Sequence, residues 1–176
     1  MSMTATFLMV TAEQFSRLEP TFGEEEEFFE VLNGIRDEAP ELPNRHPESR
    51  IVDVDQWWHM LHCAIAGDRV MPEQSEAPPP LGKIFSVGTK VQGEEMFAHF
   101  LTPDEGMEIS QALNALSTEE VRSRVESKTF MNLDLYKIHW CCAEGGADAL
   151  IDFYEDLVDF FNRAATQQSF VLFQIV

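Results

Sequence analysis

The chain has 176 residues, of which 44% are hydrophobic and 24% are charged. This balance is typical of a globular protein with one well-buried core, and it excludes general disorder. There are 31 acidic and 12 basic residues, which give a formal net charge of -19. We expect such a field to repel nucleic acid and anionic membranes and to favour basic partners or cations, although solubility alone is the simpler interpretation.

The first residues, MSMTATFLMV, contain no basic leader. The apolar run ending at Val10 is too short for a signal sequence or a membrane span, so we expect a cytoplasmic protein. The cysteines Cys63, Cys141 and Cys142 form an odd set with two adjacent members, which does not predict a disulfide framework. Reduced thiols are expected.

Residues 4–10 follow the two-residue period of a mostly buried strand. Thr11 is expected to cap a short helix that Pro20 stops, and a second helix is expected from about Glu24 to Leu32. The carboxylates of residues 24–27 oppose the positive end of that helix dipole, which gives them a structural role without any partner. The prolines between residues 37 and 47 predict an exposed loop.

The next expected helix is capped by Asp53, runs to about Ala66 and ends at Gly67. Its apolar residues follow a helical period and should face the core, and they are Val54, Trp58, Leu61 and Ile65.

The second half of the chain contains further helix-opening signals. Residues 68–80 predict a surface connection, and residues 96–101 predict a strand. Thr102 and Pro103 open a helix to about Leu116, and Ser117 with Glu120 opens another that ends near Ser127.

A long amphipathic helix is predicted from about Ala147 to Ala165, and residues 170–176 form an apolar run typical of a central strand that pairs with the first one. Together these elements predict an α+β fold in a single domain, residues 1–176. Several amphipathic helices should pack on a small, mainly antiparallel sheet that includes the N- and C-terminal strands.

Four segments of the chain resemble the YfbM-like family, a bacterial domain of unknown function. They are Met3 to Val10, then Asp55-Gln56-Trp57-Trp58-His59-Met60-Leu61-His62 with Gly67, then Pro80-Leu81-Gly82, and Phe100-Leu101-Thr102-Pro103. Trp58, Leu61, His62 and Gly67 match the family's central motif, Asp-Lys-x-Trp-x-x-Leu-His followed by apolar residues and Gly.

The chain departs from the family pattern at three places. Gln56 replaces the usual Lys, a Gly-Pro pair is absent before Phe100, and the Tyr-Pro-x-x-Trp pattern lacks its proline between Tyr136 and Trp140. The resemblance implies a mixed helix and sheet domain but no established activity, substrate or catalytic residue.

Asp55, His59 and His62 have the i, i+4 and i+7 spacing of one helix side, which permits a metal site. The sequence lacks the His-Glu-x-x-His signature, so we favour a packing role for His62 at the edge of the core, with a hydrogen bond to a backbone carbonyl. The alternative is a small-ligand pocket formed by these three residues and Trp58.

Cys141 and Cys142 lie between His139 and Glu144, a cluster that could hold a soft metal or a reactive thiolate. We expect packing residues instead, because buried free cysteines are common. No phosphate-binding, dinucleotide-binding, nucleophile-elbow or zinc-finger motif is present.

The long helix presents a row of carboxylates opposite its apolar face, consisting of Asp148, Asp152, Glu155, Asp156 and Asp159. A solvated helix face explains this row, yet it is also the best candidate for binding a basic protein partner. We therefore expect a non-catalytic, acidic protein-interaction or regulatory domain without cofactor or metal. An enzyme or small-ligand protein with a pocket beside Trp58 and His62 is the alternative.

Overall fold

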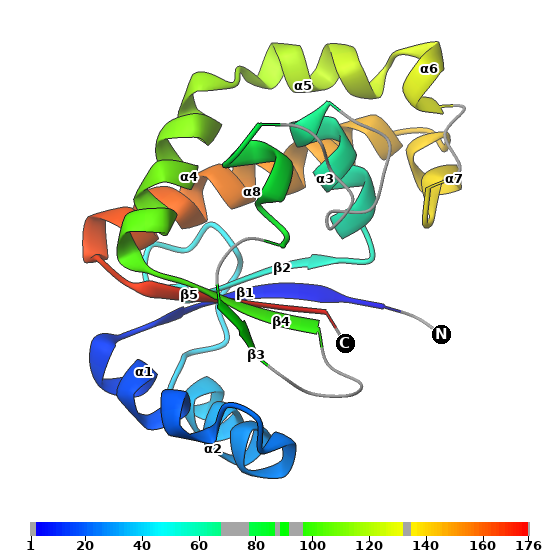
Figure 1. Ribbon diagram of the computed structural model, residues 1–176. Coiled ribbons are helices and arrows are strands. Elements are labelled where there is room, and N and C mark those ends of the chain that lie inside the picture. Colours follow the sequence, from blue (N-terminus) through cyan, green and yellow to red (C-terminus); the bar gives the residue numbers. More distant parts are fainter. Residues whose placement is uncertain (1–2, 68–77, 87–88, 92–96, 132–134, 176) are drawn as a thin grey trace.

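The computed structural model describes residues 3–67, 78–86, 89–91, 97–131 and 135–175. An antiparallel sheet crosses its centre in the strand order β2-β1-β5-β4-β3 (Figure 1). The strands are β1 (Ala5–Val10), β2 (Ile51–Asp55), β3 (Thr89–Val91), β4 (Phe97–Leu101) and β5 (Phe170–Ile175). The predicted α+β class and the antiparallel sheet with both terminal strands are confirmed.

The two terminal strands occupy the middle of the sheet. β5 lies between β1 and β4, and β1 pairs with β5 along its length, from Ala5 opposite Ile175 to Val10 opposite Phe170. Helices cover the sheet on both sides, so the strands are apolar on both faces. The apolar run at the end of the chain predicted this central strand correctly.

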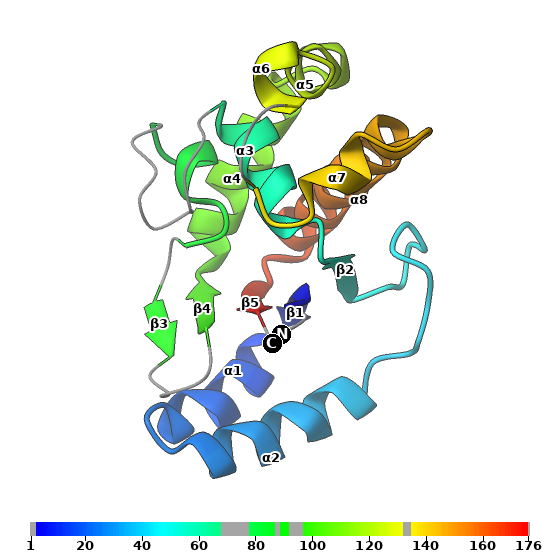
Figure 2. The ribbon, with the colours of Figure 1, turned by 90° about the vertical axis from the view of Figure 1, so that its right-hand side faces the viewer.

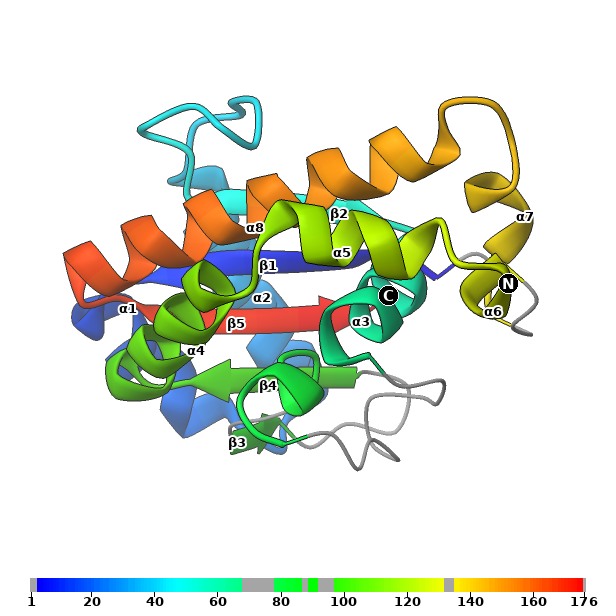
Figure 3. The same cartoon turned by 90° about the horizontal axis from the view of Figure 1, so that it is seen from above.

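Helices form a layer on each face of the sheet, as Figures 1 and 2 show. One layer consists of α1 (Ala12–Leu18), the short helix η1 (Glu19–Thr21) and α2 (Glu25–Asp37). The other layer contains α3 (Trp58–Ala66), η3 (Leu81–Lys83), α4 (Pro103–Ala115), α5 (Thr118–Val125), α6 (Lys128–Met131), α7 (Ile138–Cys141) and α8 (Gly146–Gln167). Seen from above, α8 extends along the sheet beside α4 (Figure 3).

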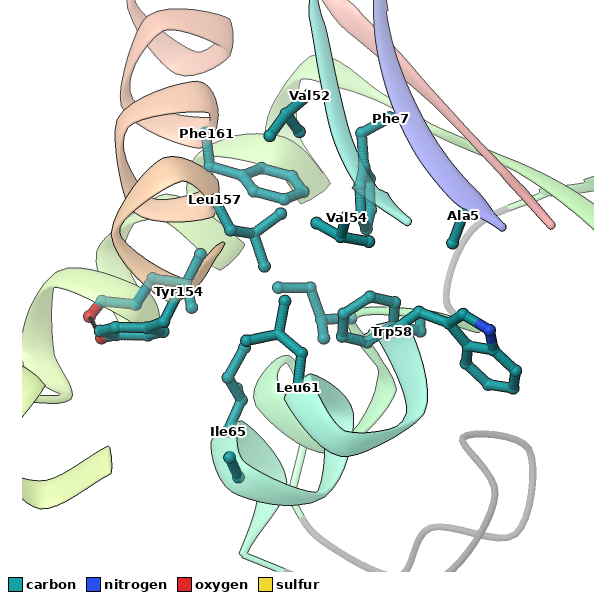
Figure 4. Packing of buried hydrophobic residues seen from close by; sticks show 14 of the residues in the cluster. Ala5, Phe7, Val52, Val54, Trp58, Leu61, Ile65, Tyr154, Leu157 and Phe161 are labelled. Atoms are coloured by element: carbon teal, nitrogen blue, oxygen red, sulfur yellow. Dashed lines mark hydrogen bonds between the residues drawn. The ribbon is translucent and has the colours of Figure 1, made fainter. Parts of the chain in front are cut away.

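Alternate residues of β1 enter two separate hydrophobic cores. Leu8 and Val10 face α1 and α2, whereas Phe7 and Met9 face α3 and α8. The ring of Phe7 lies 4.7 Å from that of Phe173 and 5.5 Å from that of Phe85, between centroids. Figure 4 shows this larger core, in which residues from β1, β2, α3 and α8 meet.

The three hydroxyl caps predicted from the sequence are confirmed. Thr11 and Thr102 each accept a backbone N–H three residues on, and the side chains of Gln14 and Glu105 return a bond to the cap residue. Ser117 accepts the backbone N–H of Glu120 and so begins α5. These caps fix helix starts because the first turn otherwise leaves backbone donors unsatisfied.

The prediction of a helix that begins at Asp53 is wrong. Residues 51–55 form β2, Asp55 has a left-handed φ of 46°, and α3 begins only at Trp58. Val54 still packs in the same core as Trp58, Leu61 and Ile65, but from the strand and not from the helix. The predicted helix end is confirmed, because Gly67 has a φ of 74°.

Other elements also differ from expectation. α2 continues through Gly34 to Asp37, beyond the expected end near Leu32, and the short elements β3, α6 and α7 were not predicted. Most of the expected connection (68–77), together with Met96 and Val176, lies outside the described residues. In the described part of the chain, no helix is long and apolar enough to span a membrane.

Candidate interaction surface

The predicted row of metal ligands does not lie on one helix. Asp55 ends β2, whereas His59 and His62 belong to α3, so the assumed i, i+4 and i+7 spacing does not apply. The left-handed conformation of Asp55 and the following turn separate the two elements. Among the described residues, no group of three His, Cys, Asp or Glu side chains could hold a metal ion.

Trp58, His59 and His62 are all buried on α3. His59 stacks on Trp58, and its Nδ1 accepts the backbone N–H of Tyr136 at 3.3 Å. The ring of His62 is fully buried and meets Phe85 edge-on, with 5.9 Å between centroids. These contacts suit the expected packing role, while the carbonyl bond expected for His62 stays a prediction.

Two of the histidines approach the same aromatic cluster. His99 lies opposite Phe173 in the β4–β5 register, which places both side chains on the α3 face of the sheet. Phe173 contacts Phe85, and Phe85 contacts His62. The remaining candidate, His139, is exposed on α7 beside Trp140. His62 and His99 are therefore brought toward one region, whereas His139 is not.

The adjacent cysteines have different environments. Cys141 is buried, its Sγ lies 3.3 Å from Sδ of Met60, and burial raises the pKa of its thiol to about 12. Such a thiol is neither a ready nucleophile nor a metal ligand at neutral pH. Cys142 is exposed on the surface. The packing role expected for Cys141 fits this geometry.

Every carboxylate in the predicted row on α8 lies close to an arginine of the same chain. Arg45 contacts three of them, lying 3.4 Å from Asp152 and 3.3 Å from Glu155 and bonding to Asp156. Arg122 lies 2.7 Å from Asp148, and Arg163 lies 3.0 Å from Asp159. The acidic face of α8 is thus partly neutralised from within.

A different acidic cluster has no such compensation. Glu24, Glu25, Glu26, Glu27 and Glu30 line a hollow of about 430 Å³ at the start of α2. None of these carboxylates forms an ion pair with another described residue. We call this cluster the α2 acidic surface. The glutamate run was visible in the sequence, but whether a described arginine pairs with it depends on the fold.

Two further hollows are formed by described residues alone. One, of about 370 Å³, lies between α4, the start of α5 and α8, and the other, of about 470 Å³, lies beside β2. Neither of these, nor the hollow at α2, is lined by Asp55, Trp58, His59 or His62. The pocket beside Trp58 and His62 therefore stays a prediction.

The fold and its surfaces define a strongly acidic α+β domain built on one antiparallel sheet. The chain belongs to the family described as a domain of unknown function (DUF1877), whose profile matches residues 1–174. It is similar to the crystal structure of YfbM from Escherichia coli, a protein of unknown function, with 16% sequence identity and a TM-score of 0.69. That match covers 98% of this chain and 99% of the other.

These comparisons confirm the resemblance based on the Trp58 to Gly67 motif. At 16% identity, the structural likeness establishes the fold alone. No curated protein matches the chain. The family and the neighbour therefore assign no activity, and the function has to be argued from the surfaces described above.

Proposed function

We propose that this chain is a non-catalytic interaction domain that binds a basic protein partner through the α2 acidic surface. The observation that carries the proposal is that arginines form ion pairs with the carboxylates of α8, whereas no described residue forms one with the α2 acidic surface. With a net charge of -19, the surface whose carboxylates form no ion pair with a described residue should attract a basic partner most strongly. The same field disfavours nucleic acid and anionic membranes, and the free thiols suit a cytoplasmic location.

The described arginines are engaged inside the chain. Arg36 donates to Thr6 and Gln174, and Arg50 donates to the backbone carbonyl of Met9. Arg17, Arg45, Arg122, Arg124 and Arg163 form ion pairs with carboxylates. Each of these guanidinium groups thus already has an acceptor, and none of them forms an ion pair with the α2 acidic surface.

The layer formed by α1, η1 and α2 has a large excess of acidic residues. Between positions 11 and 38 the acidic residues are Glu13, Glu19, Glu24, Glu25, Glu26, Glu27, Glu30, Asp37 and Glu38, and the basic residues are Arg17 and Arg36. Arg17 pairs with Glu38, while Arg36 reaches across to β1 and β5. The helix dipole stabilises the carboxylates of the first turn of α2 but leaves them accessible to a partner.

The carboxylates of α8 offer an alternative surface for the same function. Asp148 and Asp152 have side chains that are 71% and 73% exposed despite their arginine partners. A basic partner at α8 would have to compete with Arg45 and Arg122, so we expect it to bind less strongly there than at α2.

Charge-neutralising variants provide the test. A partner captured from extracts of the source cells is purified, and its affinity is measured by calorimetry over a range of salt concentrations. We expect weaker binding as salt rises, and an affinity about tenfold lower or worse for the variant with residues 24–27 changed to Gln. Binding that is insensitive to salt, or unchanged in this variant, contradicts the proposal.

A matched control keeps the change in net charge constant. Asp104, Glu108, Glu119 and Glu144 are exposed and form no ion pair with another described residue. Changing these four to Asn or Gln removes the same charge elsewhere on the surface. If this variant loses as much affinity as the α2 variant, the partner senses the overall field and not the α2 acidic surface.

A small-ligand function is the second candidate, and one buried atom favours it. The indole Nε1 of Trp58 is buried and has no hydrogen-bond partner among the described residues. Figure 4 shows Trp58 on the far side of the core from Tyr154. A buried donor of this kind is rare without an acceptor, which a ligand could supply.

The small-ligand function predicts a specific effect of changing Trp58. Trp58→Phe keeps an aromatic ring and removes the donor, so a ligand that accepts from Nε1 should bind about tenfold more weakly to this variant. The measurement is ligand occupancy in native mass spectra of both proteins purified from the source cells. Equal occupancy would exclude Trp58 as the donor.

A further inference from the structure

β2 is an edge strand of the sheet, with β1 on one side only. An exposed edge presents unpaired backbone N–H and C=O groups that can pair with another chain. The loop between α2 and β2 passes beside this edge, as Figure 2 shows. In the described part of the chain, a loop and not a strand therefore lies beside this edge.

Two side chains of the loop form hydrogen bonds with backbone groups along this edge. The carboxamide of Asn44 accepts the backbone N–H of Asp53 at 3.1 Å and donates to the carbonyl of the same residue at 3.1 Å. A residue of an antiparallel strand makes this same pair of bonds. The hydroxyl of Ser49 likewise contacts both backbone groups of Ile51, at 2.8 Å and 3.4 Å. Asn44 thus imitates one residue of a missing strand.

Contacts with α8 hold this loop in place. Arg163 donates to the backbone carbonyls of Asn44, at 2.9 Å, and of Ser49. Arg45 binds the carboxylates of α8, and Asn44 also donates to Asp156 at 2.9 Å. Arg45 is substantially exposed, so its ion pairs are of the weak, salt-sensitive kind. The ion pairs of Arg45 are therefore the tethers of the loop that a competing ligand could most easily replace.

Space is available along the same edge. The hollow of about 470 Å³ beside β2 is lined by Pro40, Glu41, Leu42, Asn44, Ile51 and Asp53. Its volume lies within the ordinary range for binding sites, and it places apolar side chains next to the carboxylates of Glu41 and Asp53. An extended occupant with basic side chains on the face toward Glu41 and Asp53 would match the charge of this lining.

We propose that the β2 edge binds an extended, basic segment of a partner protein as an added strand, and that Asn44 occupies this site in the free chain. The segment's backbone replaces the bonds from Asn44 to Asp53, and its basic side chains face Glu41 and Asp53. This site does not depend on the α2 acidic surface, and either can bind without the other.

A second copy of this chain is a poor occupant of the edge. Pairing of two β2 strands would bring the carboxylates of Asp53 and Asp55 from both copies together, and like charges across a strand pair are destabilising. Two chains that each carry a net charge of -19 also repel each other. Charge complementarity therefore selects a basic partner.

The test uses the full chain and a labelled, end-capped peptide of ten residues in which lysine and valine alternate. Asn44→Ala removes the competing side chain and should bind this peptide about tenfold more tightly than the native protein in fluorescence anisotropy, a change of about 1.4 kcal/mol. Asn33→Ala, an exposed asparagine on α2, is the matched control and should bind like the native protein.

A peptide of alternating lysine and proline has the same charge but cannot form a strand ladder. It should bind more weakly than the lysine–valine peptide to every variant. Arg45→Ala removes ion pairs that hold the loop on α8 and leaves β2 unchanged, so it should also bind the lysine–valine peptide more tightly. This variant provides a second test if Asn44→Ala folds poorly. The proposal is overturned if neither variant binds more tightly, or if both peptides bind equally well.

Discussion

A single buried hydroxyl joins α4 to α8. The phenol of Tyr154 lies 3.0 Å from the carbonyl of Leu113 and 2.5 Å from that of Leu116, at the C-terminal end of α4. Tyr154→Phe leaves these carbonyls without their donor, so we expect the free energy of unfolding to fall by about 1–2 kcal/mol in urea denaturation. Tyr136→Phe, at a partly exposed hydroxyl, is the control and should change stability by less than about 0.5 kcal/mol.

The same residue gives stability a dependence on alkaline pH. Burial raises the pKa of Tyr154 to about 12, whereas in the unfolded chain the phenol loses its proton near its ordinary value of about 10. The unfolded state therefore binds fewer protons between these values, so the contribution of Tyr154 to stability should be fully present below this window and be lost as the pH rises through it. A fall of equal size in Tyr154→Phe would contradict this assignment.

Cys141 and Cys142 differ in predicted reactivity although they are neighbours in sequence. With the pKa of Cys141 raised to about 12 by burial, we expect iodoacetamide at pH 8 to label only Cys142 of this pair in the folded protein. Peptide mass spectrometry before and after addition of urea measures both sites. Equal labelling rates in the folded protein would mean that Cys141 is accessible.

At the scale of elements, the close approach of α7 to α8 depends on one glycine. A Cβ on Gly146 would lie 1.9 Å from the backbone oxygen of Trp140 and 2.9 Å from the Cα of Cys141. Both are backbone atoms, so no side-chain rotation can relieve the clash. We expect Gly146→Ala to lower the free energy of unfolding by about 3 kcal/mol or more. Gly34→Ala, with open space around the new methyl group, should raise it by about 0.5–1 kcal/mol. Similar effects at the two sites would disprove the packing argument.

The elements that the sequence predicted share strong local signals. Hydroxyl caps mark the starts of α1, α4 and α5, and the apolar period of α8 continues over several turns. β2 was missed because Val54 happens to continue the helical spacing of Trp58, Leu61 and Ile65. No Gly or Pro separates the strand from the helix, and an aspartate, Asp55, makes the left-handed turn.

The candidate site was less predictable than the fold. Carboxylate positions can be read from the sequence, but ion pairs such as Arg45 with Asp156 or Arg122 with Asp148 join residues far apart along the chain. The sequence therefore could not distinguish the compensated carboxylates of α8 from the uncompensated ones of α2. The strand-like role of Asn44 was hidden for the same reason, because β2 itself was not expected.

For the whole molecule, we propose that a basic protein is the natural ligand of this acidic domain. Native mass spectrometry of the chain, purified gently from its source cells, tests this directly because one spectrum reports proteins, small molecules and metals bound to it. We predict a complex with a basic protein that dissociates as the ammonium acetate concentration is raised. A chain that instead retains a metabolite or metal ion at high salt, with no protein partner, would contradict the account and favour a pocket beside Trp58.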